Sequence, residues 1–112
     1  MPADESVLHV YKAGPETVVG FAGQDVLDDA NVAECRDQVM ALIDEHECKT
    51  MHVDLTGVRL VPSGLLGLLA TIRRREIEVH LYNPSDDVRE VLGVTNLDKL
   101  MPIHDVPVPR DE

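Results

Sequence analysis

The residues best placed to do chemistry lie in the stretch Val61-Pro62-Ser63-Gly64-Leu65, where a serine is expected at the start of an apolar helix. Pro62 suits the first helical position, because its ring fixes φ and its missing N–H has no partner to lose there. Ser63 would then lie in the first turn, among free backbone N–H groups and at the positive end of the helix dipole. A phosphate on this hydroxyl would be stabilised there. The stretch predicts an exposed hydroxyl that a partner protein can contact or modify.

The sequence contains no complete catalytic motif. It has no Walker loop and no GxGxxG, and Ser63 does not lie in a G-x-S-x-G pattern. His52 and His80 lie in two strand-like segments, beside Asp54 and Glu78. If these strands pair in register, the histidines share one face and allow a metal or acid–base site. The alternation of a half-exposed strand explains the histidines without chemistry, so we expect no catalytic residue, no metal and no cofactor.

Composition narrows the classes of partner and the cell compartment. A formal net charge of -11 repels phosphate backbones, so nucleic acid is not expected as a partner, whereas a protein with a basic patch is favoured. Cys35 and Cys48 are far apart and are expected to be reduced, with Cys35 a small core residue. The acidic start of the chain precedes no long apolar run. We therefore expect a cytoplasmic protein without membrane insertion.

Strand and helix patterns alternate along the chain and place Ser63 between two strands. Short β-rich runs predict five strands, of which the first two form a hairpin. The expected strands are 7–11, 17–21, 51–55, 77–82 and 101–103. Apolar residues at helical spacing predict three helices between them. The expected helices are 31–46, 62–75 and 84–92.

Cap residues mark the ends of these helices. Asp28, Asp29 and Asn31 form a cluster of cap residues before the first helix, and Asn31 precedes Glu34 at capping-box spacing. The 83–87 stretch predicts that Asn83 caps the last helix, with Pro84 as its first residue. Gly93 is expected to end this helix, and residues 96–100 to form a further helical turn.

The 112 residues fit one domain with one core, at about residues 7–105. Helices that alternate with short strands imply parallel crossovers and an α/β layer arrangement. Residues 106–112 are rich in proline and charge, and we expect a mobile tail there.

Two segments taken together resemble the STAS domain, the family of anti-sigma-factor antagonists and their relatives. The first is residues 53–67, which carry the Ser63-Gly64 pair. The second is residues 83–100, which run from Asn-Pro-Ser-Asp-Asp to Asn-Leu-Asp-Lys-Leu. The stretch 23–31 also resembles the glycine-to-Leu-Asp loop of the family. The resemblance covers roughly residues 17–105 in the element order of the family.

The resemblance implies an α/β fold with a small mixed sheet of about five strands and with helices mainly on one side. It implies a non-enzymatic module that binds an anti-sigma factor or a related serine-kinase-type regulatory protein. Ser63 is then the phosphorylation candidate, since an added phosphate brings about -1.5 to -2 charge and breaks the complex. The implied partner-binding residues are Asp28, Val61, Pro62, Ser63, Gly64 and Leu65.

Several alternatives stay open at this stage. The typical Asp-Ser-Ser/Thr-Gly loop reads Val61-Pro62-Ser63-Gly64 here, so the binding surface is compatible with a working switch or with a lost one. Asp25 and Val26 lengthen the loop before the first helix, which bears on where Asp28 lies. A STAS-type module can also bind a small ligand, a nucleotide or a lipid, within a transport or signalling assembly. A homodimer is also left open.

Overall fold

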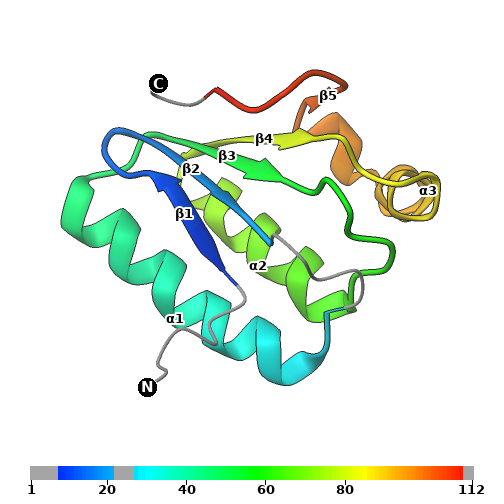
Figure 1. Cartoon of the computed structure of the whole chain (residues 1–112), viewed down its shortest axis with the longest axis horizontal. Coiled ribbons are helices and arrows are strands. Elements are labelled where there is room, and N and C mark those ends of the chain that lie inside the picture. Colours follow the sequence, from blue (N-terminus) through cyan, green and yellow to red (C-terminus); the bar gives the residue numbers. More distant parts are fainter. Residues whose placement is uncertain (1–7, 22–26, 110–112) are drawn as a thin grey trace.

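The computed structural model of the chain describes residues 8–21 and 27–109 (Figure 1). Several predicted features lie outside these residues. They are Val7 of the first strand, the acidic start, Gly23, Asp25 and Val26 of the lengthened loop, and residues 110–112 of the tail.

Five strands form one mixed sheet in the order β1-β2-β3-β4-β5. β1 (His9–Lys12) pairs antiparallel with β2 (Glu16–Gly20), as the predicted hairpin requires. β3 (Thr50–Asp54), β4 (Glu78–Tyr82) and β5 (Ile103–His104) follow, each parallel to the strand before it. The predicted fold class and the five predicted strands are confirmed, with boundaries shifted by one or two residues.

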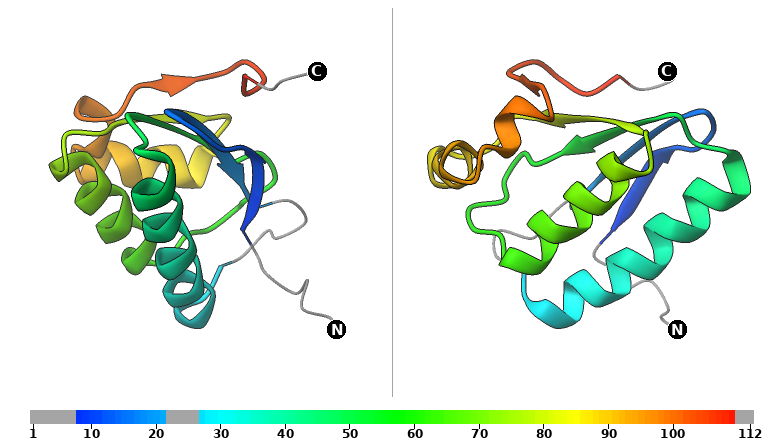
Figure 2. Two further views of the ribbon diagram at one scale, coloured as in Figure 1. Left: turned by 90° about the vertical axis from the view of Figure 1, so that its left-hand side faces the viewer. Right: turned by 180° about the vertical axis from the view of Figure 1, so that it is seen from behind.

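Three helices and a short 3-10 turn connect the strands. They are α1 (Asp29–His46), α2 (Ser63–Arg74), α3 (Asp86–Val94) and η1 (Leu97–Lys99). Figures 1 and 2 show α1 and α2 on one face of the sheet, while the chain after β5 runs over the opposite face. Within the described residues, no helix combines the length and the apolar character needed to cross a membrane.

The core fills the space between the sheet and the helices. Alternate strand residues point into it, because successive side chains in a strand face opposite sides. The largest fully buried side chains include Met51 of β3, Leu81 of β4, Leu65 and Ile72 of α2, and Leu92 of α3. Aliphatic side chains and Met dominate this core, as expected from the low content of aromatic residues.

Residues 105–109, here called the C-terminal strap, lie over the sheet face that α1 and α2 leave uncovered. Val108 is 9% exposed and packs with Val18 and Tyr82. The Nδ2 of Asn83 donates to the carbonyl oxygen of Val106 at 2.9 Å, and Arg89 Nη2 lies 2.7 Å from Asp105 Oδ1. The strap thus has apolar, hydrogen-bonded and ionic contacts, and the mobility of residues 106–112 stays a prediction.

The predicted cap of the last helix is wrong. Asn83 has a left-handed backbone with φ 57°, and its side chain reaches the strap instead of α3. Ser85 is the N-cap, because its Oγ accepts from the Val88 N–H at 3.2 Å. The helix also continues past Gly93 to Val94. Pro84, expected as the first helical residue, is buried in front of the helix.

The first turn of α2 begins one residue later than expected. Pro62 is the N-cap, with an extended backbone at φ -78° and ψ 161°, and Ser63 is the first helical residue. A one-residue shift is within the ordinary uncertainty of helix ends. It matters here because proline has no side chain that can cap, so the first N–H groups of α2 have no side-chain partner.

Candidate functional site

Ser63 lies where the sequence predicts it, exposed in the opening turn of an apolar helix. Within residues 8–21 and 27–109, no hydrogen bond involves its hydroxyl. The α2 N-terminus around it is uncapped, so backbone N–H groups and the positive end of the helix dipole face the solvent beside this hydroxyl. The geometry therefore suits a group that accepts hydrogen bonds or carries negative charge.

The loop from β3 to α2 holds Ser63 in place. Leu55 and Val58 are each 1% exposed and anchor the loop in the core. Gly57 between them has φ +84°, a conformation that strains any residue with a side chain. Further along, Ser85 Oγ donates to the carbonyl oxygen of Arg59 at 3.1 Å, which ties the loop to the start of α3. The position of Ser63 is thus set by two buried residues and by a hydrogen bond from another helix.

The N-terminal ends of α1 and α2 lie side by side (Figure 1). A Cβ added at Gly64 would come within 3.4 Å of Val32 Cγ1 and 4.0 Å of Asp29 Oδ1. The first turn of α1 therefore packs against the first turn of α2, and the Asp29 carboxylate lies beside Gly64, the residue after Ser63. Asp28, predicted in this surface, is exposed at the start of α1.

We call this region the Ser63 surface, and its residues are Asp28, Val61, Pro62, Ser63 and Gly64. Ser63 and Asp28 are exposed, while the other three are half-buried. Leu65, also predicted here, is only 2% exposed and supports the surface from the core side. Sequence reasoning missed two neighbours: Leu60, which is 47% exposed, and the Asp29 carboxylate near Gly64. No local signal in the sequence separates Leu60 from its apolar neighbours Val58 and Val61, which are less exposed.

The cap of α1 pairs Asp28 with Asn31, instead of the predicted pair Asn31 and Glu34. Asp28 Oδ1 accepts from the Asn31 N–H at 2.8 Å, and Asn31 Oδ1 accepts from the Asp28 N–H at 3.1 Å. Both side chains therefore satisfy a backbone donor at the helix start.

We expect the variant Asp28→Ala to lower the free energy of unfolding by about 1 kcal/mol, the usual cost of losing an N-cap. Glu34→Ala is the matched control, because Glu34 is exposed and takes no part in the cap. Its expected effect is below about 0.5 kcal/mol. Urea unfolding of both variants checks this, and equal losses would show that the cap is assigned wrongly.

The histidines of β3 and β4 do share one face of the sheet, because His52 and His80 are direct partners in the parallel register. His104 of β5 joins them, and we call these three residues the histidine row. The ring centroids of His52 and His80 are 5.2 Å apart, and those of His80 and His104 are 5.1 Å apart. Among the described residues, no three His, Cys, Asp or Glu side chains, those of the row included, are arranged so that they could hold a metal ion.

His52 is the most enclosed member of the row, at 8% exposed. Burial and the neighbouring His80 lower the pKa of His52 from its ordinary value, while the Glu16 carboxylate opposes this shift. The Nε2 of His52 lies 3.5 Å from Glu16 Oε1, too far for a well-formed hydrogen bond, so that attraction is mainly electrostatic. His52 Nδ1 has a close partner in the Tyr82 hydroxyl, at 2.8 Å.

Acid should therefore destabilise the fold through His52. Below the unfolded pKa of about 6.5, the unfolded chain binds a proton that the folded chain does not, so the free energy of unfolding falls as pH falls toward the lower folded pKa. We expect His52→Gln to flatten this dependence. Urea unfolding across that pH range measures the slope, and His46→Gln at the end of α1 is the comparison variant. An unchanged slope in His52→Gln would rule out this residue as the source.

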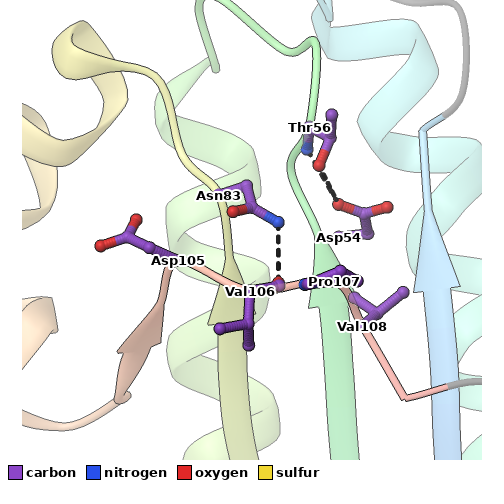
Figure 3. Close-up of a pocket in the computed structure, with 7 residues that line it drawn as sticks. All are labelled: Asp54, Thr56, Asn83, Asp105, Val106, Pro107 and Val108. Carbon is purple, nitrogen blue, oxygen red and sulfur yellow. Dashed lines mark hydrogen bonds between the residues drawn. The ribbon is translucent and has the colours of Figure 1, made fainter.

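A pocket of about 680 Å³ lies at the carboxyl ends of β3 and β4, under the strap (Figure 3). Its lining residues are Asp54, Thr56, Asn83, Asp105, Val106, Pro107 and Val108. Ligands of α/β sheets often bind at such strand ends. However, none of the lining residues is basic, and both ionisable ones are acidic, so the pocket does not suit the phosphates of a nucleotide.

Both cysteines are buried and free, as expected. Burial, with a smaller contribution from Glu34, raises the pKa of the Cys35 thiol to about 11. A thiol in this state is a poor nucleophile, so Cys35 acts as a small core residue.

Residues 10–107 match the sequence model of the STAS domain. The chain belongs to the STAS domain family. This match includes the Ser63 surface, the histidine row and most of the strap. No curated protein sequence matches this STAS domain.

Solved structures show the same fold in other proteins. The unphosphorylated form of the anti-sigma factor antagonist SpoIIAA aligns with a TM-score of 0.74 at 21% identity, covering 86% of each chain. The phosphorylated form of SpoIIAA, described as a Bacillus cell fate determinant, aligns with a TM-score of 0.65 at 18% identity, covering 86% of this STAS domain and 89% of that chain. An anti-sigma factor antagonist from Mycobacterium paratuberculosis aligns with a TM-score of 0.73 at 20% identity, covering 88% and 85%. At these identities the likeness is one of fold.

Proposed function

We propose that this STAS domain is a non-enzymatic regulatory module that binds an anti-sigma factor or a related serine-kinase-type protein through the Ser63 surface. The observation that carries the proposal is the exposed Ser63 hydroxyl at the uncapped start of α2, beside the start of α1. The family match and the anti-sigma factor antagonists of the same fold support it. Such a module would act in the cytoplasm.

The chemistry of the surface suits a protein partner. Leu60 offers an exposed apolar side chain, and Val61 and Pro62 next to it are half-buried. Asp28 and Asp29 add negative charge at the edge, in a chain whose formal net charge is -11. A partner with an apolar centre and a basic rim fits this arrangement.

Phosphorylation of Ser63 would change this surface in a definite way. The α2 N-terminus can accept hydrogen bonds and charge from a phosphate, which keeps the modified domain folded. The same phosphate adds about -1.5 to -2 charge next to Asp28 and Asp29, where a partner docks. Binding and modification would therefore exclude each other.

A two-part experiment tests the proposal on the full chain. Titration calorimetry with the anti-sigma factor of the same organism should show a stoichiometric complex. Incubation with ATP and the serine-kinase-type partner, followed by mass spectrometry, should show a phosphate on Ser63. Ser85 is an internal control, because its Oγ is engaged by Arg59 and Val88. Absence of a complex would contradict the proposal. A complex without phosphate on Ser63 would support the binding role and end the switch.

The small-ligand alternative has less support. The pocket at the strand ends is acidic and partly covered by the strap, and it offers no cation for a nucleotide. A thermal-shift screen with nucleotides and lipids tests it, since specific binding raises stability by mass action.

A further inference from the structure

The proposed binding surface lies at the helix N-termini, whereas the histidine row lies on the opposite face of the sheet and has no part in it. Three imidazoles from three adjacent strands stack at about 5 Å, and the ring of Tyr82 stacks on His104 at 4.8 Å. Three side chains of the residue type that proteins use for proton switches are thus gathered in one place, on the sheet face that the C-terminal strap crosses.

One hydrogen-bonded chain and one separate hydrogen-bonded pair lie in the row. In the chain, Glu78 Oε1 lies 3.2 Å from His80 Nε2, and His80 Nδ1 lies 2.9 Å from His104 Nε2. A neutral His80 satisfies both contacts when its Nε2–H donates to Glu78 and its Nδ1 accepts from His104. Beside this chain, a neutral His52 accepts from the Tyr82 hydroxyl at Nδ1, while its buried Nε2 lies 3.5 Å from Glu16 Oε1 without a hydrogen bond. In the neutral row, His80 thus satisfies both of its contacts and His52 its contact with Tyr82.

Added protons disturb this arrangement. The gap of 2.9 Å between His80 and His104 holds one hydrogen, so two protonated rings would point N–H groups at each other. A proton on His52 Nδ1 would force the Tyr82 hydroxyl to turn from donor to acceptor. Stacked rings at about 5 Å also bring like charges together, inside a face that the strap partly covers.

The strap depends directly on this face. It starts at Asp105, immediately after His104, and its Val108 packs on Tyr82, the partner of His52. Among residues 8–21 and 27–109, its other holding contacts are one hydrogen bond from Asn83 and one exposed ion pair with Arg89, which is a weak set. The titratable groups around the row are Tyr11, Glu16, Asp54, Glu78, Tyr82 and Asp105.

We propose that the histidine row is a proton-sensitive switch for the C-terminal strap. Protonation of the row in mild acid releases residues 105–109 while the sheet and the helices stay folded. Release uncovers Val18 and Tyr82, which the strap shields when the row is neutral.

NMR relaxation on the full chain labelled with 15N tests this. At about pH 7.5, the amides of Val106 and Val108 should have order parameters of about 0.85. At about pH 5.5, the order parameters of the same amides should fall below about 0.6. Amides of α1 and α2 should stay at the rigid value at both pH values. The midpoint of the strap signal should coincide with the titration of imidazole resonances of the row. A strap that stays ordered at the lower pH, or that loosens only together with α1 and α2, would overturn the proposal.

The double variant His80→Gln/His104→Gln keeps hydrogen-bonding side chains but cannot titrate near neutral pH. Its strap should keep the same order parameter at both pH values. The matched control is His9→Gln/His46→Gln, which removes two histidines from β1 and α1 and should respond to acid as the original chain does. If the His80→Gln/His104→Gln strap still loosens in acid, and does so again when His52→Gln is added, the release comes from a group outside the row, such as the Asp105 carboxylate, and the row is not the switch. Should this variant not fold, the coincidence of midpoints in the unaltered chain decides.

Discussion

Ser63→Glu should weaken binding of the anti-sigma factor about thirtyfold or more, which corresponds to about 2 kcal/mol. The substitution places a carboxylate in the Ser63 surface, next to Gly64, which the Asp29 carboxylate approaches. A partner that fits an acidic rim and a neutral centre would then face an unpaired charge. Titration calorimetry of the variant against the same partner measures the loss.

The fold itself should tolerate this change. A carboxylate in the first turn of α2 interacts favourably with the helix dipole, by about 0.3 to 1 kcal/mol. Unfolding of the variant therefore cannot account for lost binding, and its urea midpoint should be equal or higher. Ala41→Glu adds the same charge at an exposed position of α1 and is the matched control. If both variants bind equally well, the partner does not dock at Ser63.

Leu65→Ala should lower the free energy of unfolding by about 2 to 5 kcal/mol. Leu65 is 2% exposed and belongs to the main core, two residues after the Ser63 hydroxyl. Its truncation leaves a cavity between α2 and the sheet. The free energy of unfolding of a small domain is only about 5 to 15 kcal/mol in total, so this loss is a large fraction of it.

Leu66→Ala is the matched comparison, since Leu66 is only half-buried. Leu66→Ala should lower the free energy of unfolding clearly less than Leu65→Ala does, as measured by urea unfolding. A Leu65→Ala variant that is as stable as Leu66→Ala would contradict the placement of these neighbours. In folded Leu65→Ala, binding of the partner should persist, because the exposed atoms of the Ser63 surface are unchanged.

The order and type of the strands and helices could be predicted from the sequence, because apolar periodicity is a local signal. The alternation of residues 77–82 and the leucines after Ser63 each indicate one element without knowledge of the rest. The place of Ser63 in a first turn follows from Pro62 in the same way. These predictions are confirmed because propensity and burial agree at these positions.

The cap of α3 could not be predicted, because a distant contact decides it. Asn83 and Ser85 are both good cap residues, and the sequence offers them two positions apart. The Asn83 side chain donates a hydrogen bond to Val106, and the Ser85 side chain donates one to Arg59. Neither contact can be predicted from the local sequence pattern. Tertiary hydrogen bonds thus select between two locally equivalent caps.

The histidine row was only partly predictable. The pattern around His52 and His80 suggests a shared face, which the register confirms. His104 joins them because β5 pairs with β4 so that Tyr82 and His104 are direct partners. A two-residue edge strand carries too little pattern to fix such a register from sequence.

The strand order β1-β2-β3-β4-β5 also bears on how the chain reaches its native state. Every strand pairs with the one synthesised just before it, so no pairing has to wait for a segment that leaves the ribosome much later. Only the β1–β2 hairpin closes a short loop, whereas the parallel pairings of β2 with β3 and of β3 with β4 enclose α1 and α2. More chain must be ordered before these parallel pairs form, so we expect them to form more slowly than the hairpin. The sheet can therefore grow outward from the hairpin in chain order, with β5 and the strap added last.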